Sequence, residues 1–170
     1  MPVHITEDGK EQARMLGLEL ANIAFEVCLR TRFGRTEETA ALALAGRDVP
    51  LEVEPLFDDI DIGDLEGETI DEYHAWKSVH TRADRFPGGE SLDEAALRYA
   101  QAFRHVLART ENAVLVVCHE IPIRYALNAA AGSDSLDSPA HEIPNATPFL
   151  FDEVGLRRAA ERIETLTPRG

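Results

Sequence analysis

The sequence has few lysines, few cysteines and no long apolar run. Its 170 residues hold 31 aspartates and glutamates against 17 lysines and arginines, a net charge of −14. Nucleic acids are bound by clustered positive charge, so this balance argues against a nucleic-acid partner. The two cysteines, Cys28 and Cys118, exclude a disulfide framework and a zinc cluster. No apolar stretch approaches the ~20 residues that cross a bilayer, so we predict no membrane span.

The remaining composition is that of an ordinary globular protein. An apolar fraction of 44% supplies a core, and no repeat or low-complexity linker divides the chain. We therefore predict a single domain over residues 1–170. Residues 1–4 lack the basic region and apolar core of a secretory signal, so we expect a cytoplasmic location.

Helical and strand patterns alternate along the chain. Apolar residues recur at helical spacing over residues 7–22 and 91–109, and Ser91 and Glu94 form a capping box at the start of the second helix. Residues 113–118 are apolar on both faces, as in a central strand of a parallel sheet. Further expected elements are helices over 36–45, 70–79 and 122–132, strands over 24–28, 51–54 and 145–152, and either a helix or an edge strand over 156–166. The alternation predicts an α/β layered fold with ligands outside the carboxyl ends of its strands.

Polar residues follow two of these strands. His119 and Glu120 come directly after residues 113–118, and three arginines follow residues 24–28. An imidazole and guanidinium groups at adjacent strand ends are groups that bind a phosphate dianion or its transition state. The alternative is that His119 is a hydrogen-bonded strand-end histidine and that the arginines form a solvated turn. The arginines are Arg30, Arg32 and Arg35.

Two other patterns point to different chemistry. Cys28 precedes Arg35 with six residues between them, one more than in the C-x5-R loop of cysteine-dependent phosphatases. A more ordinary role for Cys28 and Cys118 is that of small buried residues at the ends of strands. The acidic stretch 58–67 lacks the regular ligand spacing of a calcium loop, so it is either a solvated loop or the source of a general acid.

Five short motifs occur in order along nearly the whole chain. They are Ile5–Ala13 (I-T-x-x-G-x-x-Q-A), Arg35–Ala40 (R-T-x-x-T-A), Asp59–Gly67 (D-x-x-x-G-x-x-E-G), Gly88–Ser91 (G-G-E-S) and Val116–Glu120 (V-x-C-H-E). In this order they resemble the motifs of the histidine phosphatase superfamily, whose best-known members are the cofactor-dependent phosphoglycerate mutases. Cys118 and Glu120 stand where the family pattern has serine and glycine, which marks a subfamily.

The resemblance implies a three-layer α/β/α fold with a mostly parallel sheet, like that of phosphoglycerate mutases. It also implies phosphoryl transfer or phosphomonoester hydrolysis through a phosphohistidine. A second histidine and two arginines then hold the phosphoryl oxygens, and a carboxylic acid protonates the leaving oxygen. Matched by position, the phosphate arginine is Arg35, the second histidine His119 and the acid Asp59, with Asp58 as its competitor; Glu90 and Ser91 flank the pocket, and Arg30 adds charge at its rim.

One family motif is missing from the sequence. The family's first strand ends in L-x-R-H-G, which supplies the nucleophilic histidine and the first phosphate arginine, and these residues contain no R-H-G. The resemblance therefore implies that the first, central strand is missing and that the domain is N-terminally truncated relative to the family. His4 falls where the family has a residue remote from the site. The other histidines, His74, His80, His105 and His141, have no arginine–histidine–glycine context.

Three functions fit these residues. In the first, the chain binds phosphate or a small phosphorylated metabolite through Arg35 and His119 but is inactive as a phosphoric monoester hydrolase. In the second, the parent gene encodes an active phosphatase, and the chain starts at an internal methionine. In the third, the chain is a non-catalytic interaction module whose vacant strand position is filled by another chain, most simply in a homodimer. We expect no cofactor and no metal.

Overall fold

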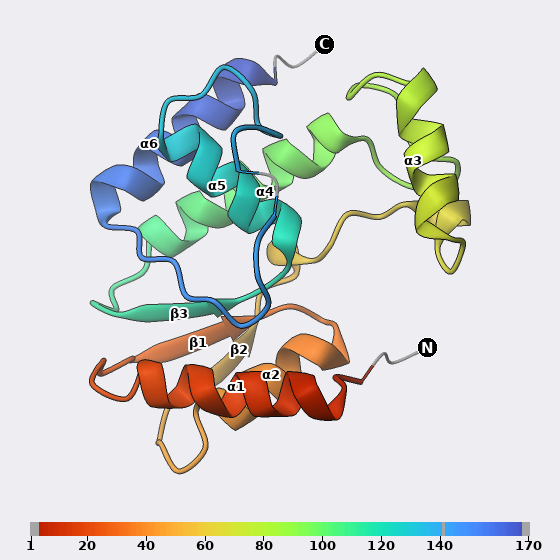
Figure 1. Cartoon of the computed structure of the whole chain (residues 1–170). Coiled ribbons are helices and arrows are strands. Elements are labelled where there is room, and N and C mark those ends of the chain that lie inside the picture. The colour runs from red at the N-terminus through yellow and green to blue at the C-terminus, as the bar shows by residue number, and fades with distance from the viewer. Residues whose placement is uncertain (1–3, 141, 168–170) are drawn as a thin grey trace.

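The computed structural model describes residues 4–140 and 142–167 and has an α/β fold (Figure 1). Its sheet contains β1 (Val27–Arg30), β2 (Leu51–Val53) and β3 (Val114–Val117) in the order β2-β1-β3. β1 pairs in parallel with both neighbours, and Arg30 lies opposite Val53 and Val117. All three strands therefore end at the same edge of the sheet.

Helices cover both faces of the sheet, as Figure 1 shows. On one face lie α1 (Glu7–Glu19) and α2 (Gly34–Ala43). On the other lie α4 (Leu92–Leu107), α5 (Glu120–Ala130) and α6 (Glu153–Leu166). The remaining helix, α3 (Ile70–Val79), stands apart from these layers, at the right of the view. The arrangement confirms the predicted α/β class with a small parallel sheet.

The sequence explains why the main helices form where they do. The hydroxyl of Ser91 accepts from the backbone of Glu94, and Glu94 bonds back to the backbone of Ser91, so the predicted capping box starts α4. The inner faces of α4 and α6 carry small residues that are fully buried, which lets the two helices pack closely. These residues are Ala95, Ala96, Ala102, Ala159 and Ala160.

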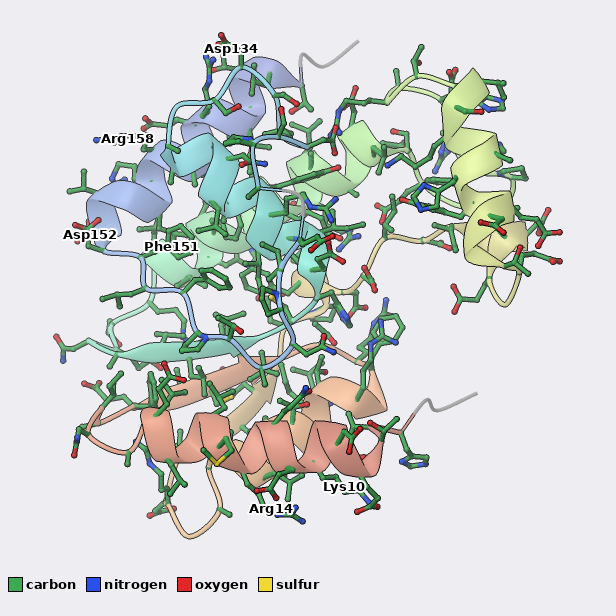
Figure 2. The ribbon with its side chains drawn as sticks, in the orientation of Figure 1. Lys10, Arg14, Asp134, Phe151, Asp152 and Arg158 are labelled. Atoms are coloured by element: carbon green, nitrogen blue, oxygen red, sulfur yellow. The ribbon has the colours of Figure 1, made fainter. Side chains whose placement is uncertain are left out.

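α1 and α2 also pack at close range. A Cβ atom on Gly17 would lie 2.6 Å from the carbonyl oxygen of Ala43, so only glycine fits at this crossing. The opposite side of α1 is solvent-exposed, and Figure 2 shows Lys10 and Arg14 directed away from the sheet. Each pairs with a glutamate one turn earlier, Glu7 or Glu11. The helix is thus apolar toward the sheet and charged toward solvent.

The expected strand over residues 145–152 does not form. Residues 145–146 are a turn in which Ala146 has a φ of 49°, residues 147–152 belong to no helix or strand, and Pro148 lacks an N–H donor. Of the two alternatives for residues 156–166, the helix is observed, as part of α6. Among the described residues, β3 pairs with β1 alone, so it lies at an edge of the described sheet and not at its centre.

The acidic stretch 58–67 is a loop, as expected. It contains a short 3-10 turn at Gly63–Leu65, and another at Pro55–Phe57 precedes it. Within residues 4–140 and 142–167, no helix is both long and apolar enough to span a membrane. Residues 1–3, part of the stretch considered for a secretory signal, and His141 lie outside the described residues.

Candidate functional site

Two neighbouring strand ends bring the polar residues together. Because Arg30 of β1 lies opposite Val117 of β3, the residues that follow the two strands share one edge of the sheet. Thr31 follows β1 directly, and His119 precedes the first residue of α5. The Oγ1 atom of Thr31 lies 3.0 Å from Nε2 of His119. His119 therefore sits at the predicted edge, held by the strand beside its own.

His119 is buried, and its hydrogen bonds assign its tautomer. Nη2 of Arg35 lies 3.1 Å from Nδ1, and a guanidinium can only donate, so Nδ1 accepts. The proton of the neutral ring then lies on Nε2, which donates to Thr31. The hydroxyls of Thr31 and Thr36 are 2.8 Å apart, and Thr36 donates to the carbonyl of Phe33 at 2.8 Å. A chain of bonds of fixed direction thus orients the imidazole.

The surroundings of His119 keep its ring neutral. Burial, more than any other cause, lowers the pKa of His119 to about 4, and the positive charge of Arg35 acts in the same direction. The carboxylate of Asp59, whose Oδ2 lies 3.5 Å from Nδ1, opposes this shift. At neutral pH the site therefore presents a neutral imidazole between a guanidinium and a carboxylate.

Arg35 and Asp59 form the exposed part of this cluster. Nη2 of Arg35 lies 2.8 Å from Oδ2 of Asp59, and both side chains are about one-third exposed, at 32% each. The guanidinium lies 4.5 Å above the ring of Phe33, which itself packs edge-on against His119 at 4.9 Å. Phe33 therefore orders Arg35 and shields one side of the imidazole.

The two candidate acids occupy different environments. The Asp58 side chain is 7% exposed, and its carboxylate accepts from the backbone N–H of Arg32 at 2.9 Å and from the Arg32 guanidinium. Asp59 instead lines the cavity described below, as do Arg35 and His119. The structure thus brings Asp59, and not Asp58, to the groups expected to hold a phosphoryl oxygen.

Arg98 of α4 holds the loop that carries both aspartates. Its guanidinium donates to the backbone carbonyls of Leu56 and Asp58 at 2.9 Å each and to that of Asp59 at 3.3 Å. The same guanidinium pairs with Glu90, and the carboxylate of Glu90 accepts from the backbone of Asp61 at 3.0 Å. One partly buried arginine therefore holds the loop through its backbone carbonyls.

Two glycines let the 88–91 turn pack against this loop. A Cβ atom on Gly89 would lie 2.3 Å from the carbonyl oxygen of Asp61, and one on Gly63 would lie 2.1 Å from that of Pro87. Gly63 also has a φ of +55°, which favours glycine. The acidic loop and the glycine turn are thus interlocked backbone to backbone.

Three further predicted site residues lie outside the cavity lining. Arg30 donates to the carbonyl of Thr31 at 3.0 Å and pairs with Glu37. Glu90 is bound to Arg98, and Ser91 caps α4. The structure thus brings together Arg35, His119 and Asp59. Arg30, Glu90 and Ser91 bond to other protein groups, and the predicted phosphate contacts of these three stay predictions.

Other histidines are engaged elsewhere. His4 lines the same cavity as His119, nearer the site than the family pattern indicates, and its Nδ1 bonds to the carboxylate of Glu38. His80 stacks on Trp76, and His105 lies 3.3 Å from Glu54. None of the described histidines besides His119 bonds to Arg35 or Asp59.

The cysteine and metal alternatives find no support in the described residues. Burial raises the pKa of Cys28 and of Cys118 to about 12, so both remain thiols at neutral pH and neither is an activated nucleophile. Within the part of the chain that the structure describes, no three histidine, cysteine or carboxylate side chains gather in a way that could hold a metal ion.

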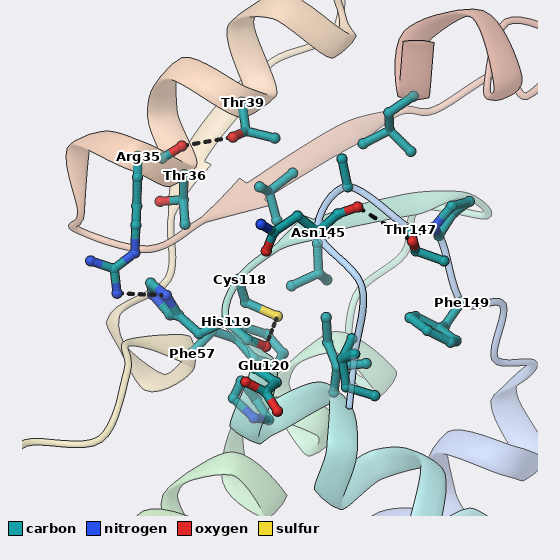
Figure 3. A pocket seen from close by; sticks show the side chains of 18 of the residues that line it. Arg35, Thr36, Thr39, Phe57, Cys118, His119, Glu120, Asn145, Thr147 and Phe149 are labelled. Carbon is teal, nitrogen blue, oxygen red and sulfur yellow. Dashed lines mark hydrogen bonds between the residues drawn. The ribbon is translucent and has the colours of Figure 1, made fainter. Parts of the chain in front are cut away.

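The cluster forms one end of a cavity of about 740 Å³ (Figure 3). Figure 3 shows Arg35 directed at His119 on one side, with Asn145, Thr147 and Phe149 across the cavity. The walls between these ends are mainly apolar and belong to β3, α1, α4 and α5. The arrangement offers charge-assisted donors at one end and an apolar chamber behind them, a combination suited to binding an anion.

The sequence alone did not point to Thr31, Phe33 or Arg98. Thr31 is identifiable once β1 and β3 are known to be neighbours, because it directly follows β1. Arg98 lies on the polar boundary of a strongly amphipathic helix, where a charged residue is ordinary. No sequence signal placed it against a loop that precedes it by about forty positions.

Comparison with known proteins gives a consistent result over most of the chain. The model of the histidine phosphatase superfamily (branch 1) matches residues 1–162. A probable phosphoglycerate mutase GpmB of Erwinia tasmaniensis is 26% identical over 136 residues, which are 75% of this chain and 63% of that protein. The 2,3-bisphosphoglycerate-dependent phosphoglycerate mutase of a Methylobacterium species is 27% identical over 164 residues, 86% of this chain and 78% of that protein.

Solved structures agree with the sequence matches. Bacillus stearothermophilus YhfR superposes with a TM-score of 0.69 at 25% identity, covering 80% of this chain and 72% of that one. The chain spans less than two thirds of the length of the Erwinia tasmaniensis protein.

Proposed function

Because the chain belongs to the histidine phosphatase superfamily, we propose that Arg35 binds the phosphoryl group of a small phosphorylated metabolite and that His119, on taking a proton at Nδ1 when the dianion arrives, donates to the same group. The observation that carries this proposal is the contact of the Arg35 guanidinium with a buried, oriented imidazole at the carboxyl edge of a parallel sheet. Arg35 supplies a permanent positive charge, and a planar guanidinium suits bidentate contact with phosphate.

For the acid position of the family's reaction, the candidate we favour is Asp59. It lines the cavity beside Arg35, and a carboxyl group there can protonate a leaving oxygen once it has gained a proton itself. Asp58 is bound to Arg32 and lies outside the cavity lining.

Phosphohistidine chemistry requires a nucleophilic nitrogen opposite the bound phosphoryl group. Nε2 of His119 is occupied by its bond to Thr31, and Nδ1 faces Arg35. Among the described histidines, His4 alone shares the cavity; its side chain is 71% exposed and bonds to Glu38, not to Arg35, Asp59 or His119. We therefore expect the 170-residue chain to bind phosphate and not to turn over phosphomonoesters, as a pseudophosphatase does.

Two assays with purified protein test binding and turnover separately. Calorimetric titration with inorganic phosphate is expected to show one site, weakened about tenfold or more in Arg35→Met. Assays with p-nitrophenyl phosphate are expected to show no hydrolysis above the blank. Hydrolysis that disappears in His119→Ala would show that a nucleophile exists and would overturn the inactivity. Phosphate binding that Arg35→Met leaves unchanged would overturn the site itself.

A further inference from the structure

The helix α3 makes few contacts with the other helices and strands. In Figure 1 it stands apart from them, on the side of the sheet where β1 and β3 end. Of the α3 side chains whose burial the structure describes, none is fully buried, and only Tyr73, Trp76 and Lys77 are partly buried. These three lie at positions i, i+3 and i+4, on one face of the helix. We call this face the inner face of α3.

Aromatic stacking on Phe86 holds the inner face against the rest of the protein. The ring of Trp76 lies 4.2 Å from that of Phe86, and the ring of Tyr73 stacks on the same phenylalanine at 5.7 Å. Phe86 is 1% exposed and belongs to the main core. The helix therefore rests on the core through one side chain, and most of its surface faces solvent.

The two ends of the α3 segment are held differently. After the helix, the guanidinium of Arg82 pairs with Asp93 at 3.0 Å and with Asp137, so this end is fixed to α4 and to the loop after α5. Before the helix, Gly67 has a φ of +91°, and a Cβ atom there would meet nothing within 4 Å. A helix fixed at one end, with an unpacked glycine at the other, can move as a rigid unit.

The inner face of α3 is directed toward the polar cluster of the candidate site. Burial raises the pKa of Tyr73, and the negative charges of Asp137 and Asp59 act in the same direction. The charge of Asp59 thus acts on Tyr73 across the space between them. The Nζ atom of Lys77 lies 5.4 Å from the centre of the Tyr73 ring. Lys77 is therefore carried beside a side chain that the candidate site already influences.

The positive charge of Lys77 is not matched by any described carboxylate. Its contact with Tyr73 is a cation–π contact, and it makes no hydrogen bond or ion pair within the described residues. Every other described lysine or arginine bonds to a carboxylate or to a backbone carbonyl. A phosphoryl dianion adds negative charge to a chain that already carries −14. Lys77 is the cation left to offset it.

We propose that α3 is a lid that closes over the polar cluster when a phosphorylated ligand is bound, and that Lys77 then binds a phosphoryl oxygen. The ammonium group exchanges the Tyr73 ring for a charge-assisted hydrogen bond, which is the stronger interaction. Closure also shields the ligand from water. The proposal rests on the phosphate site proposed above and adds to it a second cation on a moving element.

The test uses the single tryptophan of the chain, Trp76, as a reporter of α3. Inorganic phosphate, titrated at constant ionic strength, is expected to change the Trp76 fluorescence with the dissociation constant found by calorimetry. Lys77→Met is expected to weaken phosphate binding about fivefold or more and to remove the fluorescence change. Lys77→Arg keeps the charge and is expected to retain both. Lys10→Met removes the only other lysine, on the outer side of α1, and is expected to leave both unchanged.

Amide hydrogen exchange follows the lid itself. Phosphate is expected to slow exchange over residues 71–79 in the wild type and not in Lys77→Met. Because Lys77 has no ion pair, both proteins are expected to melt at the same temperature, which separates lost binding from lost folding. Phosphate binding that Arg35→Met abolishes and Lys77→Met leaves at wild-type strength would overturn the lid and leave the phosphate site standing. A wild type that binds no phosphate would overturn the proposed function, and the lid with it.

Discussion

The two ends of the cavity differ in how completely their polar groups are bonded. At the His119 end, the imidazole, the Thr31 hydroxyl, the Arg35 guanidinium and the Asp59 carboxylate all have protein partners. At the β3 end, the walls are apolar, and the backbone edge of Val114–Val117 has no described partner. The same sheet thus carries a fully bonded polar cluster at one end of the cavity and an apolar chamber beside it.

The two ends of the cavity also differ in what holds them in place. The polar end is held by elements that the chain contains, namely the loops after β1 and β3, the acidic loop and α4. The geometry of the polar end therefore does not depend on what occupies the apolar end of the cavity. The variants below are ordered by the size of the expected effect, and each changes one side of this comparison.

The largest effect is expected at Arg98, which supports the polar end from inside. Replacing it in Arg98→Met leaves the carboxylate of Glu90, 17% exposed, without its cation and removes donors from three loop carbonyls. We expect a loss of about 3–5 kcal/mol in the free energy of unfolding, measured by urea denaturation. The control, Arg104→Met, removes an exposed pair with Glu164 and is expected to cost about 1 kcal/mol or less. Equal losses in the two variants would show that the loop does not depend on Arg98.

The pH dependence of stability tests the neutral state of His119. Its pKa is about 4 in the folded protein and ordinary, near 6.5, in the unfolded chain, so between these values the unfolded state binds more protons. The stability from this group is complete above about pH 6.5 and falls as the pH drops toward 4, by roughly 2–3 kcal/mol in total. His119→Gln is expected to remove this part of the profile, and His105→Gln to keep it. A His119→Gln profile that matches the wild type between pH 4 and 6.5 would contradict the assignment.

A smaller effect is expected from Thr31, which orients the imidazole. Thr31→Val removes the acceptor for the buried Nε2–H and is expected to cost about 1–2 kcal/mol of stability. The contact with Arg35 remains, so the ring is expected to stay protonated on Nε2, which ¹⁵N chemical shifts of the ring nitrogens report. Thr165→Val removes an exposed hydroxyl bonded to a helix carbonyl and is expected to change stability by less than about 0.5 kcal/mol. A ring that becomes protonated on Nδ1 in Thr31→Val would contradict the role of Arg35 in setting the tautomer.

The smallest effect is expected at the exposed edge of the sheet. Val53 on β2 is 47% exposed, so Val53→Lys is expected to shift the free energy of unfolding by less than about 0.5 kcal/mol. Sedimentation velocity is expected to show the same assembly state as the wild type. A large destabilisation, or a change in assembly, would mean that β2 is not a solvent-exposed edge of the sheet.

Local sequence patterns predicted the elements whose signals are themselves local. The capping box and periodicity of α4, the apolar run of β3 and the meeting of His119 with the residues after β1 all follow from short stretches and the parallel-sheet rule. The strand over 145–152 was wrong because residue alternation does not show whether a partner strand exists, and Pro148 and Ala146 oppose extended pairing. The different surroundings of Asp58 and Asp59 depend on contacts with Arg32 and Arg98, which no local pattern contains.

Direct observation of phosphate at the polar end tests the central claim. In a ¹H–¹⁵N titration with inorganic phosphate, the guanidinium of Arg35 and the ring nitrogens of His119 are expected to shift together with one dissociation constant. Amides of β2 are expected to stay unchanged, and Arg35→Met is expected to abolish the His119 shift. If phosphate moves neither Arg35 nor His119, or if Arg35→Met binds as the wild type does, the polar end is not a phosphate site.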